Sequence, residues 1–189
     1  GVIGLRIIRV FIFFCLFLIF THSSVNEKSK IINNLKNIDN IQFKFTQKTN
    51  ESIEKGKCIL AFPGKLKCDY IDKNEKELIV NKKMMAITQK RYGKTLFYPL
   101  SKSTFINILN KNELIKVINE SSTIIDDYIN IVFIDKNNIK TLIKFDKKKF
   151  LLAGWTSFDQ YNNQIVFEIE ITSLNQMINN NVFTLPSKG

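Results

Sequence analysis

Pairs of carboxylates are the side chains in this sequence whose type and spacing come closest to catalytic chemistry. Asp126 and Asp127 are adjacent, and Glu168 and Glu170 are two residues apart. Two carboxyl groups can share general acid and base work when they are positioned on one substrate. Glu168 and Glu170, however, alternate with apolar residues, so on a strand they would share the solvated face. We therefore expect surface charges at both positions, with a hydrolase built on one of these pairs as the alternative.

Other catalytic residue types are scarce. His22 is the only histidine, and the seven glycines are scattered without forming a phosphate-binding loop. Because no histidine follows residue 22, the rest of the chain has none for a Ser-His or Cys-His nucleophile pair or for a conventional zinc site. We expect no catalytic residue, no metal site and no cofactor.

The start of the chain has the pattern of an export signal. Arg6 and Arg9 precede eleven consecutive apolar residues, 10–20. A secretory hydrophobic region has about 7–15 apolar residues, whereas a membrane-spanning helix needs about 20. Small and polar residues follow, so residues 1–23 are predicted to be a secretory signal peptide and residues 24–189 a single exported domain. An uncleaved N-terminal anchor is the alternative.

The predicted mature chain is strongly basic. Without Arg6 and Arg9 it keeps 26 basic and 17 acidic residues, a formal charge of +9. Such a surface attracts anionic headgroups, lipids or nucleic acid within a Debye length. Export removes nucleic acid as a natural partner. The excess of lysine over arginine is also more typical of a solvated surface than of nucleic-acid recognition.

Most of the sequence alternates apolar and polar residues with the period of two that predicts half-buried β-strands. The clearest case is 41–47, where Ile41, Phe43 and Phe45 share one face. Apolar residues at helical spacing predict short helices at 28–37 and 103–110. The other predicted strands are 57–62, 65–70, 77–80, 84–89, 95–98, 128–134, 139–145, 151–158 and 164–171.

These elements predict a mainly β (α+β) fold. A doubly wound fold needs a helix between successive parallel strands, whereas about ten strands joined by short turns favour antiparallel hairpins. A sheet of this size must curl, which produces a strongly curved antiparallel sheet covered by short lid helices. Because few helices cover the concave face, we expect an apolar cavity there. A filled sheet face, typical of a purely structural envelope protein, is the alternative.

Two cysteines flank a predicted hairpin turn. Cys58 and Cys68 are equidistant from Pro63, so a three-residue turn at 62–64 would make them cross-strand partners close enough for a disulfide. A register shifted by one residue would place them on opposite faces as two small buried thiols. Both outcomes stay open at this point.

The order of these motifs resembles the family of the periplasmic lipoprotein carrier LolA. The resemblance covers nearly all of the predicted mature chain, and its motifs together are more specific than any one of them. It is carried by the strand ending Phe45-Thr-Gln47, by Gly56, and by the segments 63–70, 78–80, 105–109 and 182–186, the last of these similar to the family's closing Phe-x-x-Pro.

The resemblance implies a fold and a function. The fold would be an unclosed antiparallel β-barrel lidded by helices. The protein would be a monomeric, non-catalytic carrier in the periplasm. It would take lipoproteins from an inner-membrane ABC transporter and pass them to an outer-membrane acceptor lipoprotein. A different lipid-binding or envelope-stress-sensing protein of the same fold is the alternative.

The expected acyl cavity is apolar throughout. The family commonly has an arginine at the position of Phe62 and tryptophans at the positions of Cys68 and Ala86, whereas the single tryptophan here is Trp155. These differences keep the site apolar and remove a polar contact to the lid. The predicted acyl-binding residues are Phe43, Phe45, Leu60, Phe62, Leu66, Tyr70, Met84, Phe105, Leu109, Ile143, Phe145 and Trp155.

Overall fold

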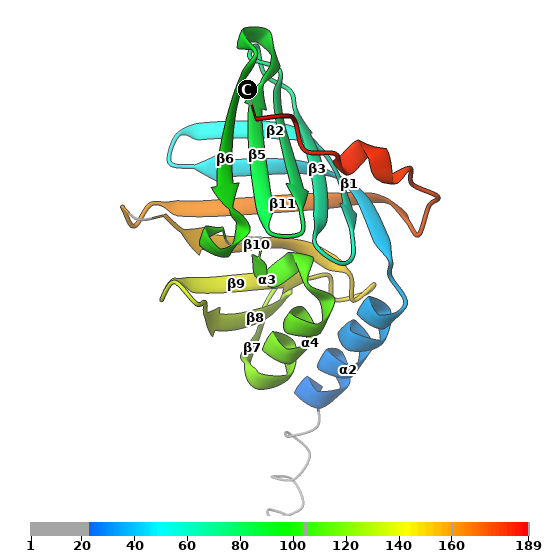
Figure 1. Ribbon diagram of the computed structural model, residues 1–189. Coiled ribbons are helices and arrows are strands. Elements are labelled where there is room, and N and C mark those ends of the chain that lie inside the picture. Colours follow the sequence, from blue (N-terminus) through cyan, green and yellow to red (C-terminus); the bar gives the residue numbers. More distant parts are fainter. Residues whose placement is uncertain (1–22, 104–105, 160, 189) are drawn as a thin grey trace, which may run out of the picture.

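The computed structural model describes residues 23–103, 106–159 and 161–188 (Figure 1). The predicted signal peptide, up to residue 22, and Phe105 lie outside these ranges. No helix among the described residues is long and apolar enough to cross a membrane.

Eleven strands and a few short helices make up the described part of the chain. The strands are β1 (Asn40–Thr49), β2 (Ser52–Ala61), β3 (Lys65–Tyr70), β4 (Lys76–Asn81), β5 (Met84–Gln89), β6 (Lys94–Pro99), β7 (Ser122–Ile125), β8 (Ile129–Ile134), β9 (Lys140–Phe145), β10 (Leu152–Phe158) and β11 (Gln164–Leu174). The α-helices are α2 (Ser23–Lys36), α3 (Ile106–Leu109) and α4 (Lys111–Glu120), and the 3-10 helices are η1 (Lys90–Tyr92), η2 (Leu100–Lys102) and η3 (Asn180–Phe183).

All the strands belong to one antiparallel sheet with the order β6-β5-β4-β3-β2-β1-β11-β10-β9-β8-β7. Within the described residues β6 and β7 are the two edges, and they do not pair with each other. In Figure 1 strands β5 and β6 stand at a steep angle to β9, β10 and β11, so the sheet is strongly curved. The predicted fold class, a mainly β unclosed sheet with short helices, is confirmed.

Two register shifts accompany the curvature. One lies opposite Gln42 and Phe43 of β1, where β11 has the extra residue Thr172, and the other lies between Leu152 and Gly154 in β10, where Ala153 is extra. An extra residue on one strand bends that strand and increases its local twist. Gly154 has a φ of +147°, which L side chains rarely adopt, and a Cβ there would lie 2.1 Å from the carbonyl oxygen of Phe167.

The three α-helices cover one side of the sheet, which we call the inner face. Ile31 and Leu35 of α2 and Leu114 and Ile118 of α4 are buried in the same core as the sheet side chains. Helices α2 and α4 contact each other, and α4 also contacts β8 (Figure 1). The core therefore lies between the inner face and this helical layer.

Helix α4 and strand β7 were absent from the sequence-based prediction, which ended the second helix at residue 110. The signal for α4 was present, because Leu114 and Ile118 have helical spacing. Asn110 caps the helix: its side chain accepts hydrogen bonds from the backbone N–H groups of Asn112 and Glu113. Strand β7 is four residues long and mostly exposed, so its alternation is too short to be recognised.

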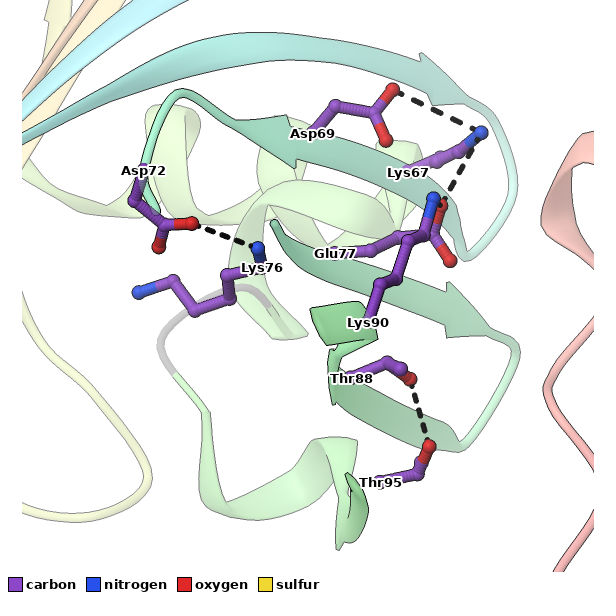
Figure 2. A network of polar contacts seen from close by, with 8 residues as sticks. All are labelled: Lys67, Asp69, Asp72, Lys76, Glu77, Thr88, Lys90 and Thr95. Atoms are coloured by element: carbon purple, nitrogen blue, oxygen red, sulfur yellow. Dashed lines mark hydrogen bonds and ion pairs between the residues drawn. The ribbon is translucent and has the colours of Figure 1, made fainter. Parts of the chain in front are cut away.

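The outer face of β3 and β4 carries a network of ion pairs that includes a lysine of η1 (Figure 2). Glu77 lies at its centre, with a carboxylate oxygen 3.6 Å from the Lys67 ammonium and 2.6 Å from that of Lys90. Lys67 also lies 3.8 Å from Asp69. The hydrogen bond to Glu77 raises the pKa of Lys90 above its ordinary value. This network joins two neighbouring strands to the helical turn η1.

Glu77→Gln is expected to lower the free energy of unfolding by about 1 kcal/mol, because one largely buried carboxylate serves two lysines. The Glu77 side chain is 13 % exposed, whereas the Glu168 side chain, paired with Lys48, is 53 % exposed. Thermal unfolding of Glu77→Gln and of the matched control Glu168→Gln would measure the difference. Equal melting temperatures for the two variants would contradict a stabilising role for the network.

Candidate functional site

A row of aromatic rings crosses the inner face. The indole of Trp155 in β10 stacks on Phe167 in β11, with ring centroids 4.2 Å apart. Phe167 stacks in turn on Phe45 in β1 at 4.9 Å, and Phe45 meets Tyr70 in β3 edge to face at 4.9 Å. Such contacts stabilise a sheet beyond the burial of area alone. The row joins strands that are far apart in the sequence.

Gly56 makes room for this row. It lies on β2 between Phe45 and Tyr70, which are its partners on the two neighbouring strands. A Cβ at this position would lie 2.6 Å from the Phe45 ring and 2.3 Å from the backbone oxygen of Asp69. The absence of a side chain therefore allows the Phe45 ring to lie over the strand.

Most of the predicted acyl-binding residues meet on the inner face. Phe62 and Tyr70 are half-buried and pack against the core, and burial raises the pKa of the Tyr70 phenol, which keeps it neutral. Phe105 lies outside the described residues. The other predicted residues that belong to the buried core are Phe43, Phe45, Leu60, Leu66, Leu109, Ile143, Phe145 and Trp155.

Met84 is the exception. It is half-buried and shares a face of β5 with Ala86, whereas the neighbouring Met85 and Ile87 pack against the core. Side chains on a strand alternate between its two faces, so Met85 takes the inner position that the sequence-based prediction gave to Met84. Two adjacent methionines have the same side chain, so the sequence does not indicate which of them lies on the inner face.

The inner face is closed by the helices in this structure. Ile108 and Leu109 of α3 are buried among the sheet side chains, so the apolar space expected above the sheet is occupied by the lid. The N–H of Gly64, in the turn between β2 and β3, donates to the carbonyl oxygen of Leu109 at 2.9 Å. The Lys111 ammonium lies 5.2 Å from the centroid of the Phe62 ring. These two contacts tie the lid to that turn.

Cys58 and Cys68 are cross-strand partners in β2 and β3, and their sulfur atoms form a disulfide. The register is the one with a three-residue turn at 62–64, so the structure selects the bridge over two free thiols. On the inner face of β2 and β3 the bridge lies between the Leu60–Leu66 pair and the Gly56–Tyr70 pair, next to the aromatic row.

The carboxylate pairs lack the environment of a catalytic pair. Asp126 is exposed, and its carboxylate accepts hydrogen bonds from the Tyr128 N–H and from the Asn130 side chain, which lower its pKa. Glu168 and Glu170 are exposed and line a hollow of about 600 Å³ on the outer face, together with lysines such as Lys44. The described residues contain no group of three side chains suited to hold a metal ion.

A larger cleft opens beside the helical lid. Its volume is about 1240 Å³, and it lies between β5 and η2 on one side and the β8–β9 and β10–β11 turns on the other. The cleft is therefore bordered by the two halves of the sheet, at a gap that a closed barrel would not have. Its lining residues are Met85, Lys102, Ser103, Asn137, Asn138, Ile139, Lys140, Phe158, Asp159, Tyr161, Asn162 and Ile165.

An open, curved antiparallel sheet with an aromatic inner face under short helices is an unclosed, helix-lidded β-barrel. Within this class the chain belongs to the family of the outer membrane lipoprotein carrier protein LolA, whose family model matches residues 36–186. The matched range runs from the end of α2 to beyond η3. A search of curated proteins found no match.

Solved structures with a similar arrangement have low sequence identity. A LolA-superfamily protein from Nitrosomonas europaea has 9% identity and a TM-score of 0.45, covering 83% of this chain and 97% of its own. A putative outer membrane lipoprotein-sorting protein domain from Vibrio parahaemolyticus has 9% identity and a TM-score of 0.46, covering 85% and 97%. MucB of Pseudomonas aeruginosa, solved in complex with MucA, has 9% identity and a TM-score of 0.45, covering 86% and 61%.

Proposed function

We propose that this protein is a periplasmic carrier that binds the acyl chains of lipoproteins against the inner face of its sheet. The observation that supports this proposal best is the continuous apolar inner face, from Ile143 to Leu66, covered by separate short helices. A sheet that only needed a core could bury it against a single long helix or a second sheet. Separate short helices, in contrast, can move away from the sheet one at a time and expose its apolar face to a ligand.

The free energy of exposed acyl chains makes such a carrier necessary. Each methylene group in water costs ~0.8 kcal/mol, so two or three long chains cannot cross an aqueous compartment unprotected. The cargo comes from an inner-membrane ABC transporter and leaves to an outer-membrane acceptor lipoprotein. The protein works as an exported monomer and catalyses no reaction.

Acyl chains enter by displacing the lid. Ile108 and Leu109 of the short helix α3 occupy the space above the sheet, and arriving chains replace their apolar contacts with equivalent ones. The hydrogen bond from Gly64 to Leu109 and the contact of Lys111 with Phe62 favour the closed, empty form. Phe62 itself gives the loaded form additional apolar surface, where the family commonly has an arginine.

The single tryptophan provides a direct test. Trp155 is buried in the middle of the inner face. A synthetic diacylated lipopeptide with brominated acyl chains should quench Trp155 fluorescence several-fold, because bromine quenches an indole that it contacts. The same peptide without acyl chains should leave the emission unchanged.

One further measurement makes this test decisive. The brominated lipopeptide should bind Trp155→Phe with similar affinity in a separation assay, since that variant keeps an aromatic ring at the site. Binding of the lipopeptide without any quenching would place the chains outside the barrel and would refute the proposed site. A complete lack of binding would refute the carrier function.

A further inference from the structure

Four segments meet at one end of strands β2 to β6, beside the helical lid (Figure 1). They are residues 62–65, 82–83, 100–102 and 109–113. The N–H of Gly64 donates to the carbonyl oxygen of Leu109, and the carbonyl oxygen of Gly64 accepts from the N–H of Lys82 at 2.8 Å. The N–H of Leu100 donates to the carbonyl oxygen of Lys83, also at 2.8 Å. These backbone bonds hold the segments together as one rim.

This rim is strongly basic. Its segments contain a single acidic residue, Glu113, and five lysines: Lys65, Lys82, Lys83, Lys102 and Lys111. We call these five lysines the basic rim. The carboxylate of Asp39 lies 3.9 Å from the Lys111 ammonium. Lys82, Lys83 and Lys102 are exposed and form no ion pair within the described part of the chain. The rim therefore presents uncompensated positive charge next to the lid.

The side chains of the basic rim suit a broad anionic surface better than one small anion. Lysine is a compact point charge, whereas arginine matches a single phosphate or carboxylate with two parallel hydrogen bonds. The five lysines also come from four separate segments rather than from one pocket. Pro63 and Pro99 are exposed at the same end of the sheet, so apolar surface accompanies the charges. Lysines combined with exposed apolar side chains are typical of peripheral membrane-binding surfaces.

We propose that the basic rim docks this protein on the anionic surface of a lipid bilayer, with the lid end of the sheet facing the headgroups. The attraction of each lysine falls off within a Debye length, so the bilayer acts on the lysines nearest to it. A cluster on one rim therefore orients the whole molecule. This inference goes beyond the proposed cargo, because docking requires neither acyl chains nor movement of the lid.

Vesicle binding tests the docking directly. All eleven described strands and the buried core lie within residues 24–189, so this part of the chain is used, without added lipopeptide. It should co-sediment with vesicles of phosphatidylglycerol and phosphatidylethanolamine, and not with vesicles of phosphatidylcholine. Added salt should weaken the binding, because it screens the charges. Lys82→Gln/Lys83→Gln/Lys102→Gln should weaken it about tenfold or more.

A matched control removes the same charge near the opposite end of the same strands. Lys55, Lys73 and Lys94 are exposed there, close to η1. Lys55→Gln/Lys73→Gln/Lys94→Gln lowers the formal charge of the protein by the same amount, yet its affinity for the anionic vesicles should stay within about threefold of the parent protein. Equal losses in the two triple variants would show that only net charge matters and would overturn the basic rim.

The orientation is tested with an environment-sensitive dye. Cys58 and Cys68 are bridged, so a cysteine introduced elsewhere can be labelled selectively. Ser101 in η2 and Tyr92 in η1 are both exposed and lie at opposite ends of β6. The emission of a dye on Ser101→Cys should shift to the blue on anionic vesicles, whereas a dye on Tyr92→Cys should keep its emission. Equal shifts, or a larger shift for Tyr92→Cys, would overturn the proposed orientation.

The docking proposal and the carrier proposal can fail independently. A parent protein that binds neither kind of vesicle would overturn the docking and make an acidic protein the candidate partner of the rim. Quenching of Trp155 by the brominated lipopeptide would in that case still support the carrier. A parent protein that binds anionic vesicles through the basic rim and does not bind the lipopeptide would support the docking and refute the carrier.

Discussion

Gly56→Ala is expected to lower the free energy of unfolding by about 3 kcal/mol, a loss typical of forcing extra atoms into a packed core. The added methyl group would meet the backbone oxygen of Asp69 at 2.3 Å and the ring of Phe45 at 2.6 Å. The ring could rotate away, but the carbonyl belongs to the neighbouring strand and cannot move without disturbing the β2–β3 pairing. Thermal unfolding should show a decrease of roughly 6–12 °C.

Gly93→Ala is the matched control for this prediction. Gly93 has a φ of +60°, and a Cβ there would meet no atom within 4 Å. The free energy of unfolding of Gly93→Ala should therefore fall by about 1 kcal/mol, from backbone strain alone. A Gly56→Ala variant as stable as Gly93→Ala would show that the inner face can expand, and the packed arrangement of Phe45 over β2 would then be wrong.

Removal of the disulfide by Cys58→Ala/Cys68→Ala should lower the free energy of unfolding by about 3 kcal/mol. The bridge closes a short loop, with ten residues of sequence separation between the cysteines. In the chain-entropy account, the stabilisation arises because the bridged unfolded chain has fewer conformations. Denaturant unfolding of the parent protein and of the double variant would measure the loss.

Reductant provides the control for the disulfide prediction. A thiol reductant should destabilise the parent protein to about the level of the double variant and leave the double variant unchanged. An equal effect of the reductant on both proteins would show that the stability does not come from the Cys58–Cys68 bridge. The third cysteine, Cys15, lies in the predicted signal peptide, so both proteins are prepared as residues 24–189, which lack it.

Local patterns in the sequence were sufficient for every described strand except β7. A side chain on a strand points to alternate faces, so the alternation around Phe43 and Phe45 predicted both the strand and its buried side. The turn at Pro63 and Gly64 predicted a hairpin, but it left two registers open, one with Cys58 and Cys68 as cross-strand partners and one with them on opposite faces.

Sequence-based prediction was less accurate where contacts with neighbouring strands decide which side chain is buried. Met84 and Met85 are adjacent and chemically identical, so only the pairing of β5 with β4 and β6 selects Met85 for the inner face. Helix α4 follows α3 after a single residue, Asn110, which the sequence-based prediction took as the end of one helix and which instead caps the next. The aromatic row is also non-local, because Phe45 and Phe167 belong to strands near opposite ends of the chain.

The sequence by itself therefore determined the alternating strands, the antiparallel hairpins, the apolar character of one face and the scarcity of catalytic side chains. These properties depend on residue type and on short-range periodicity. Only the tertiary structure decided that the disulfide forms, that the helical lid fills the space above the sheet, and that a cleft opens between the two halves of the sheet. Those outcomes depend on contacts between elements distant in the chain, and the curvature that creates them is a property of the whole sheet.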